Sequence, residues 1–349
     1  MRWVVLQVIG GFMLVNLPLS AIAQDDVGGN TSGEPVVTGI HEAMYVRAGG
    51  IDQWVQIRGD NLANPVLLWL NGGPGGSTMP ETPIFRSWER HFTVVMWDQR
   101  GEGKTYEKHG DSIADTMSVD QIAADGIEIS RFVLAHLHKQ QLVLLGHSWG
   151  SILGIHMIDS APQLFSVYVG TGQVTNLPRQ LEAAYPTLLE LAISNEEAMQ
   201  ELSALGPPPW PSRSEYDRIE HWESELEPPA LPPTEEDQQT WMQLPMPEFP
   251  QYLDDGEEFS YRLLGAAMDK EDMPALATRF SVPIVLIQGQ ADLLTTTSVV
   301  REYFDQMQAP DKLLIEIPDA GHNVIFTSRE SFLEQLLTIV RPMAVYAEL

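Results

Sequence analysis

A serine lies between two glycines in the segment Gly146-His147-Ser148-Trp149-Gly150, which follows the apolar run "QLVLL". The run that begins at the serine, "SWGSILGIHMIDSAP", is compatible with a helix that stops near Pro162. The Gly-x-Ser-x-Gly pattern between a strand and a helix predicts a sharp turn that exposes the serine hydroxyl. Glycines on both sides let neighbouring chain pass without Cβ clashes. We therefore predict that Ser148 is a nucleophile rather than a structural loop serine.

A serine hydroxyl is a poor nucleophile at neutral pH and needs an adjacent base. The segment "VPIVLIQGQADLLTT" places Asp292 just beyond a predicted strand, and "KLLIEIPDAGHN" places His322 beyond the next one. In the fold that carries this kind of turn, the other two residues of the catalytic triad follow the serine along the chain, first the acid and then the histidine. We predict that His322 acts first as general base and then as general acid, while Asp292 orients the imidazole. Asp319 is a competing acid, although its position after the strand fits less well. We expect the side chain of His147 to point away from Ser148.

The glycine-rich segment "LLWLNGGPGGS" could approach either a phosphate or a developing oxyanion. A phosphate loop of the Walker type needs Gly-Lys-Ser or Gly-Lys-Thr at its end, and this segment has no lysine. The segment "GEGKT" has the lysine, but it lacks the glycine required upstream. We therefore predict an oxyanion hole in which the backbone N–H groups of Gly73 and Trp149 face the oxygen of a tetrahedral intermediate.

Short apolar runs rich in β-branched residues indicate buried strands. Two further strands are predicted around a Gly-Gly turn in "AMYVRAGGIDQWVQIRG". A helix is predicted over Ser118 to His138, with Ser118 as its cap and Gln121 at the capping-box position. Alternation of strands and helices predicts a mostly parallel central sheet covered by helices on both faces. The strand candidates are "PVLLWLN", "FTVVMWD", "QLVLLGH", "FSVYVGT", "VPIVLIQG" and "KLLIEIP".

The alternation stops within residues 174–275. This segment contains 14 of the 25 prolines, and it holds 22 Asp and Glu against 5 Lys and Arg. We interpret it as an inserted, mainly helical cap domain between two parts of a core, residues 24–173 and 276–349. A disordered linker is the alternative, but three tryptophans favour a packed cap: Trp210, Trp222 and Trp241.

Composition limits the function. The 349 residues are 44% hydrophobic, so the chain can bury a sizeable core. The formal net charge of −28 argues against a nucleic-acid partner, because neutralising phosphates needs Lys and Arg. The sequence has no cysteine and no His-Glu-x-x-His motif, so we predict no metal and no cofactor.

The N-terminus has the pattern of a secretory signal peptide over residues 1–23. Arg2 gives a positive start, an uncharged apolar run follows, and Ala21-Ile22-Ala23 provides the cleavage pattern. The mature protein would begin at Gln24, would be secreted or periplasmic, and would have no stable association with the membrane. An uncleaved membrane anchor is the alternative, since the apolar run is about long enough to span a bilayer.

Three linked motifs resemble the prolyl aminopeptidase (proline iminopeptidase) branch of the α/β-hydrolases. That branch carries His-Gly-Gly-Pro-Gly, Asp-Gln-Arg-Gly-x-Gly-x-Ser and Gly-Gly-Ser-Trp-Gly-Ser. The corresponding stretches here are Asn71 to Gly75, Asp98 to Thr105 and Gly146 to Ser151. Asn71, Thr105 and His147 depart from the family pattern. The resemblance implies an α/β-hydrolase fold from about residue 40 onward.

Serine carboxypeptidases also carry the Asn71 type of loop, but they place a Glu before the nucleophile where this chain has His147. The resemblance to prolyl aminopeptidases implies that cap carboxylates bind the free α-amine of a substrate. Asn71, Glu223 and Glu258 are the candidate substrate-binding residues.

The leading hypothesis is an exported serine hydrolase that releases N-terminal residues, with proline among the candidates, from short peptides. The alternatives are a carboxylesterase or other small-molecule hydrolase, because one fold hosts many chemistries, and a non-catalytic binding protein.

Overall fold

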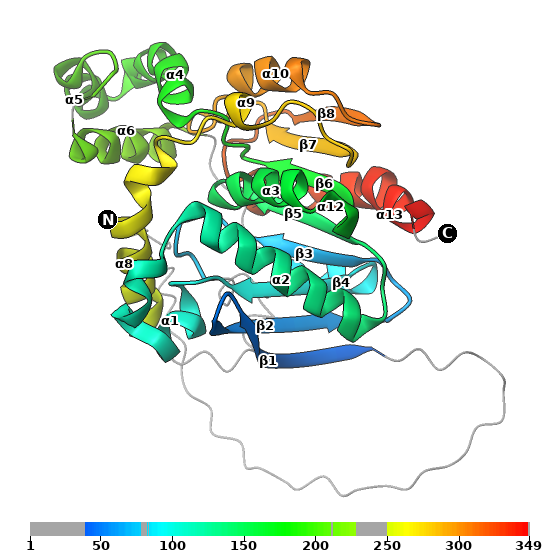
Figure 1. Cartoon of the computed structure of the whole chain (residues 1–349). Coiled ribbons are helices and arrows are strands. Elements are labelled where there is room, and N and C mark those ends of the chain that lie inside the picture. Colours follow the sequence, from blue (N-terminus) through cyan, green and yellow to red (C-terminus); the bar gives the residue numbers. More distant parts are fainter. Residues whose placement is uncertain (1–38, 78–81, 83, 211, 228–249, 348–349) are drawn as a thin grey trace, which may run out of the picture. The chain divides into compact units, whose positions relative to one another are not determined.

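A single eight-stranded sheet, with strand order β1-β2-β4-β3-β5-β6-β7-β8, organises the structure (Figure 1). The structure is a computed structural model that describes residues 39–77, 82, 84–210, 212–227 and 250–347. The predicted signal peptide, its alternative as an anchor, and Trp241 therefore lie outside the described residues. The strands are β1 (Ile40–Ala48), β2 (Ile51–Gly59), β3 (Val66–Leu70), β4 (Thr93–Asp98), β5 (Leu142–His147), β6 (Phe165–Thr171), β7 (Ile284–Gly289) and β8 (Lys312–Ile317).

The sheet is mostly parallel, as predicted. Only β1–β2 and β2–β4 pair in the antiparallel sense, and the remaining pairs are parallel. Every residue of β3, β4, β5, β6 and β7 is buried, which explains why these strands are continuous apolar runs rather than alternating ones. All eight strands fall on the runs that predicted them.

Helices cover both faces of the sheet. The described α-helices, of which α4 to α9 lie in the insertion between β6 and β7, are α1 (Gly103–His109), α2 (Val119–Leu137), α3 (Trp149–Ser160), α4 (Leu177–Leu191), α5 (Glu196–Leu205), α6 (Arg213–Leu226), α8 (Gln251–Met268), α9 (Met273–Leu276), α10 (Thr297–Gln306), α11 (Val324–Thr327), α12 (Arg329–Gln335) and α13 (Arg341–Ala347). Short turns of other helix types are η2 (Ile84–Arg86), η3 (Trp88–Arg90), η4 (Gly110–Thr116), η5 (Pro162–Leu164), η6 (Ala192–Ser194) and the π-helical η7 (Leu336–Val340).

Two apolar clusters pack against opposite faces of the sheet. Alternate residues of β3 show the division, because Leu68 packs with α2 and α3 whereas Trp69 packs with η3, α12 and α13. Helix α2 begins as predicted, since the Ser118 hydroxyl accepts the N–H of Gln121 at 3.1 Å. The capping-box prediction for Gln121 is wrong: its side-chain amide donates to Asp125 instead, at 2.8 Å.

Between β6 and β7, every described element is helical: α4, η6, α5, α6, α8 and α9. Trp210 and Trp222 are buried in this segment. The ring of Trp210 lies 5.9 Å from that of Tyr185 and 5.4 Å from that of Tyr216. These contacts give the inserted helices a packed interior, so their described part is not a loose linker. Figure 1 shows α4, α5 and α6 as one group of helices.

No helix among the described residues is both long enough and apolar enough to cross a membrane.

Candidate active site

The turn between β5 and α3 has the strained geometry that the glycine pattern predicted. Ser148 has φ 51° and ψ −119°, a conformation that non-glycine residues rarely adopt. A Cβ at Gly146 would lie 2.4 Å from the carbonyl oxygen of Gly150. A Cβ at Gly150 would lie 2.1 Å from the carbonyl oxygen of Leu70. Both glycines are therefore required for the close passage of chain around Ser148, which is itself partly exposed.

The two residues that follow β7 and β8 meet through their side chains. His322 Nδ1 lies 3.2 Å from Asp292 Oδ2, and both residues are buried. Thr295 Oγ1 donates to the same carboxylate oxygen at 2.5 Å and lies 3.1 Å from His322 Nδ1. Gln288 Nε2 donates to it as well, at 2.7 Å. The competing acid, Asp319, is exposed, so Asp292 is the partner of the imidazole.

Charge and hydrogen bonding act together on this pair. Burial opposes ionisation of Asp292, but the neighbouring His322 charge and the hydrogen bonds from His322 and Thr295 hold the pKa of Asp292 below its usual value. Burial favours neutral His322, but the Asp292 charge and hydrogen bond raise the pKa of His322 above its usual value. The arrangement therefore stabilises a protonated imidazole, which is what a general base becomes after it has taken a proton.

Ser148 and His322 share a common neighbour in the turn after β6. The backbone N–H of Ser148 donates to the carbonyl of Thr171 at 3.1 Å. Gly172 follows directly, and a Cβ there would lie 2.8 Å from Cε1 of His322. The lack of a side chain at Gly172 thus makes room for the imidazole close to the serine turn. All three predicted catalytic residues follow the carboxyl ends of parallel strands of the one sheet: Ser148 follows β5, Asp292 follows β7 and His322 follows β8.

The loop after β3 passes close to the serine turn, because a Cβ at Gly72 would lie 3.5 Å from Cβ of Ser148. Gly73 has φ +145°, and a Cβ there would lie 2.6 Å from the backbone nitrogen of Gly75. Trp149 is the first residue of α3, and the first N–H groups of a helix have no partner within it. The helix dipole adds partial positive charge at the same place. Both features suit the N–H of Trp149 to an anionic oxygen, and the role of the Gly73 N–H stays a prediction.

Asn71 supports this loop, and the prediction that it binds substrate receives no support. Its side chain is fully buried. Its amide nitrogen donates to Glu102 Oε2 at 3.0 Å and to the carbonyls of Gly72, at 3.0 Å, and Gly76. Its amide oxygen accepts from Gln99 Nε2 at 3.1 Å. All of its polar atoms are therefore used to hold the turn.

The two predicted cap carboxylates differ sharply in environment. Glu223, on α6, is 2% exposed, and neither of its side-chain oxygens has a hydrogen-bond partner among the residues that the structure describes. Burial, and then the charges of Glu220, Glu227 and Asp292, raise the pKa of Glu223 well above its usual value. Glu258, on α8, is exposed. The helix turns that side chain to solvent, so the structure does not support a binding role for Glu258.

The sequence profile that describes the alpha/beta hydrolase fold matches residues 65–328. The chain belongs to the α/β-hydrolase fold family. It is 30% identical over 294 residues to "Probable aminopeptidase YbaC" of Bacillus subtilis, covering 78% of this chain and 88% of that protein. It is 29% identical over 136 residues to "Probable proline iminopeptidase" of Streptomyces coelicolor, covering 39% of this chain and 40% of that protein.

Among solved structures, a proline iminopeptidase-related protein of Thermus thermophilus aligns with a TM-score of 0.59 at 21% identity, covering 87% of this chain and 99% of that one. That likeness supports the α/β-hydrolase fold. The predicted fold class is confirmed, and the similar sequences confirm the predicted resemblance to prolyl aminopeptidases.

In this α/β-hydrolase, His147 occupies a position where the prolyl aminopeptidase motif has glycine. Its ring is buried, stacks on Trp69 and lies 5.0 Å from the ring of His322. Its Nε2 lies 3.3 Å from the carbonyl oxygen of His322, so Nε2 carries the proton and donates it. Burial, followed by the nearby His322 charge, lowers the pKa of His147 to about 3, so its ring is neutral at neutral pH.

Sequence reasoning missed Thr295 and Gln288 beside Asp292, and it also missed Gln99, Glu102 and Glu227. Gln99 accepts from Trp149 Nε1 at 3.0 Å, and its backbone N–H donates to Glu102 Oε1 at 2.7 Å. Because Glu102 and Gln99 both bond to Asn71, one buried network joins the serine turn to the oxyanion loop. The Asp-Gln-Arg-Gly motif contains Gln99 and was the signal that could have identified it. No local motif marks Glu227.

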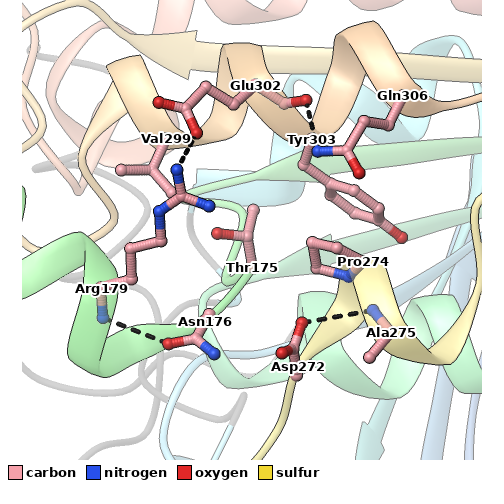
Figure 2. Close-up of a pocket in the computed structure, with 10 residues that line it drawn as sticks. All are labelled: Thr175, Asn176, Arg179, Asp272, Pro274, Ala275, Val299, Glu302, Tyr303 and Gln306. Carbon is pink, nitrogen blue, oxygen red and sulfur yellow. Dashed lines mark hydrogen bonds and ion pairs between the residues drawn. The ribbon is translucent and has the colours of Figure 1, made fainter.

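A pocket of about 340 Å³ lies beside the start of α4, α9 and α10, and no predicted site residue lines it (Figure 2). Its polar groups serve local contacts: Asn176 caps α4, Asp272 caps α9, and Arg179 pairs with Glu302. We therefore assign the site from the arrangement of Ser148, Asp292 and His322 and not from this cavity. Within the described part of the chain, no group of three or more His, Cys, Asp or Glu side chains is placed to hold a metal ion.

Proposed function

We propose that the protein is an exported serine hydrolase that acts as an aminopeptidase on short peptides through Ser148, His322 and Asp292. The family membership and the similarity to a protein named as an aminopeptidase support a hydrolase of peptide bonds. The contact between Asp292 and His322, and the strained turn at Ser148, support the serine mechanism.

The reaction begins when Ser148 Oγ attacks the carbonyl carbon of the first peptide bond. His322 takes the serine proton at Nε2, while its Nδ1–H stays bonded to Asp292. The N–H groups of Gly73 and Trp149 bind the resulting oxyanion, and one such donor contributes about 3 kcal/mol to the transition state. His322 then gives the proton to the departing amine, which leaves an acyl-enzyme. Water, deprotonated by His322, releases the N-terminal residue and restores the serine.

The observation that carries the aminopeptidase proposal is the buried carboxyl of Glu223, which has no hydrogen-bond partner among the described residues. Ionising a buried carboxyl without a partner is costly, so this group keeps its proton in the free protein, and a bound ammonium group would offset the cost and stabilise its ionised form. Glu220, Glu227 and Asp292 add negative charge around it, as their effect on the pKa of Glu223 indicates. A positively charged group is therefore the ligand that this part of the cap suits, and a peptide N-terminus supplies one next to the bond to be cut.

The test compares three substrate types on the purified protein: aminoacyl-naphthylamides with a free amine, the same compounds N-acetylated, and short-chain p-nitrophenyl esters. We expect turnover of free-amine amides and loss of turnover on acetylation, because acetylation removes the charge. A panel of proline, alanine and leucine naphthylamides would rank proline among the candidate residues. Ester turnover without turnover of any free-amine amide would instead establish an esterase.

Two variants separate the roles. Ser148→Ala should abolish turnover and leave the thermal transition in place, whereas activity near wild type would place the nucleophile elsewhere. Glu223→Gln should raise KM for free-amine substrates more than it changes ester hydrolysis.

Export is tested separately by N-terminal sequencing of the protein from its native host. The sequence should begin at Gln24, and a sequence that begins at Met1 would exclude cleavage.

A further inference from the structure

The end of helix α6 delivers a carboxylate to the two loops that carry Asp292 and His322. The helix ends at Leu226, and Glu227 follows with its backbone N–H bonded to the carbonyl of Glu223 at 3.0 Å. The side chain of Glu227 is partly buried and points toward the loops that follow β7 and β8.

Each oxygen of this carboxylate is taken by a different catalytic loop. Glu227 Oε1 accepts the backbone N–H of Leu293 at 3.0 Å, and Leu293 directly follows Asp292. Glu227 Oε2 accepts the backbone N–H of His322 itself, at 2.9 Å. Burial, followed by the charge of Asp292, raises the pKa of Glu227 to about 7, while the charge of His322 and the two N–H bonds act in the opposite direction and favour the ionised carboxylate. One side chain thus spans the loop after β7 and the loop after β8.

The chain makes room for this contact at one glycine. A Cβ at Gly321 would lie 2.1 Å from Glu227 Oε2 and 2.5 Å from its Cδ. Any other residue at this position would push the carboxylate away from the His322 N–H. The contact therefore requires Gly321 as well as Glu227.

We propose that Glu227 is a positioning residue: it holds the loops of Asp292 and His322 in register, so that a cap helix completes the catalytic triad. In its ionised form Glu227 also adds negative charge beside the imidazole, together with Asp292 and Glu220, and this charge favours the imidazolium formed when Ser148 is deprotonated. This inference rests on the proposed roles of Ser148 and His322. Glu227 supports the triad, whereas Glu223 remains the proposed ligand of the substrate ammonium group.

The experiment measures two quantities in Glu227→Gln: the second-order rate of Ser148 labelling by a fluorophosphonate, and kcat and KM on a free-amine naphthylamide. Glutamine keeps the size of the side chain but offers one acceptor oxygen, and its NH₂ group faces one of the two N–H donors. We expect the labelling rate and kcat to fall about tenfold, with KM changing less than twofold. The fluorophosphonate carries no ammonium group, so its rate reports on the triad alone.

Gly321→Ala provides an independent variant that retains Glu227 and displaces it. It should slow labelling as Glu227→Gln does, and it keeps the proposal testable if the first variant does not fold. Glu225→Gln, on the exposed side of the same helix, is the matched control and should label at the wild-type rate.

Labelling within twofold of wild type in both test variants would overturn the proposal. A defect confined to KM of free-amine substrates would also overturn it, because it would make Glu227 a substrate ligand. A wild-type protein that the probe does not label would refute the proposed nucleophile, and this inference with it.

Discussion

Thr295 offers the sharpest test of how the acid of the triad is supported. Its fully buried hydroxyl donates to Asp292 Oδ2 at 2.5 Å, and its oxygen lies 3.1 Å from His322 Nδ1. Because the hydroxyl proton is donated to Asp292, the lone pairs of the oxygen can accept the imidazole Nδ1–H, which is shared with Asp292, and a longer contact from Gln288 Nε2 at 3.3 Å. Thr295→Val keeps the shape of the side chain and removes these contacts of the hydroxyl.

The size of the effect follows from the donors that remain. Asp292 keeps Gln288 Nε2 and the backbone N–H of Thr295, each at 2.7 Å, so the carboxylate stays ionised and in place. A hydrogen bond to a charged group contributes about 1.5–3 kcal/mol. Since about 1.4 kcal/mol corresponds to a factor of ten in rate, we expect kcat/KM to fall by roughly ten- to a hundredfold.

The assay is kcat/KM on a naphthylamide, with urea denaturation of each variant run in parallel. Thr295→Ser keeps the hydroxyl and loses only a methyl group, so it should retain most of the activity. The reasoning would be refuted if the valine variant stayed within twofold of wild type, or if serine and valine were equally impaired.

Three further predictions concern the turn, the cap and a helix start. Gly150→Ala should lower the free energy of unfolding by about 3 kcal/mol in urea denaturation, because its Cβ would meet the backbone oxygen of Leu70 at 2.1 Å; an unchanged transition would contradict the close approach. Glu223 should make wild-type stability fall as pH rises above 4.5, the ordinary pKa, because the folded state keeps a proton that the unfolded state releases. Glu223→Gln should therefore gain in Tm relative to wild type between pH 5 and 8, and a constant difference would count against the raised pKa. Ser118→Ala should cost about 1 kcal/mol through the lost bond to the N–H of Gln121, and Ser118→Asp should restore most of it.

The elements of the fold were predictable because their signals are local. Strands buried on both faces need unbroken apolar runs, and β3 and β5 show this directly. The serine turn was predictable for a related reason, since its two glycines are required by backbone that lies within a few residues or on the adjacent strand.

The contacts that support the site could not be predicted from local sequence patterns. Glu227 bonds to Leu293, 66 positions away, and to His322, 95 positions away, so neither contact leaves a local pattern. Asn71 was expected to bind a substrate. A side-chain amide can equally well hold a buried loop through hydrogen bonds, and only its partners in the structure distinguish the two roles. Glu258 was chosen from its place in an acidic segment. Whether a residue of α8 is exposed or buried depends on which face of the helix it occupies, and the acidic composition does not determine that face.

The attachment of α6 to the catalytic loops has a consequence for exchanging substrate specificity between relatives. Insertions between β6 and β7 look like modules that could be swapped freely, since both ends join neighbouring strands of one sheet. In this protein the module also supplies the acceptor for the main-chain amides of Leu293 and His322. A chimera carrying a foreign insertion would leave those two amides without that acceptor, unless the donor protein places a carboxylate at the same helix end. Recombination designs should therefore transplant Glu227 and Gly321 as a pair.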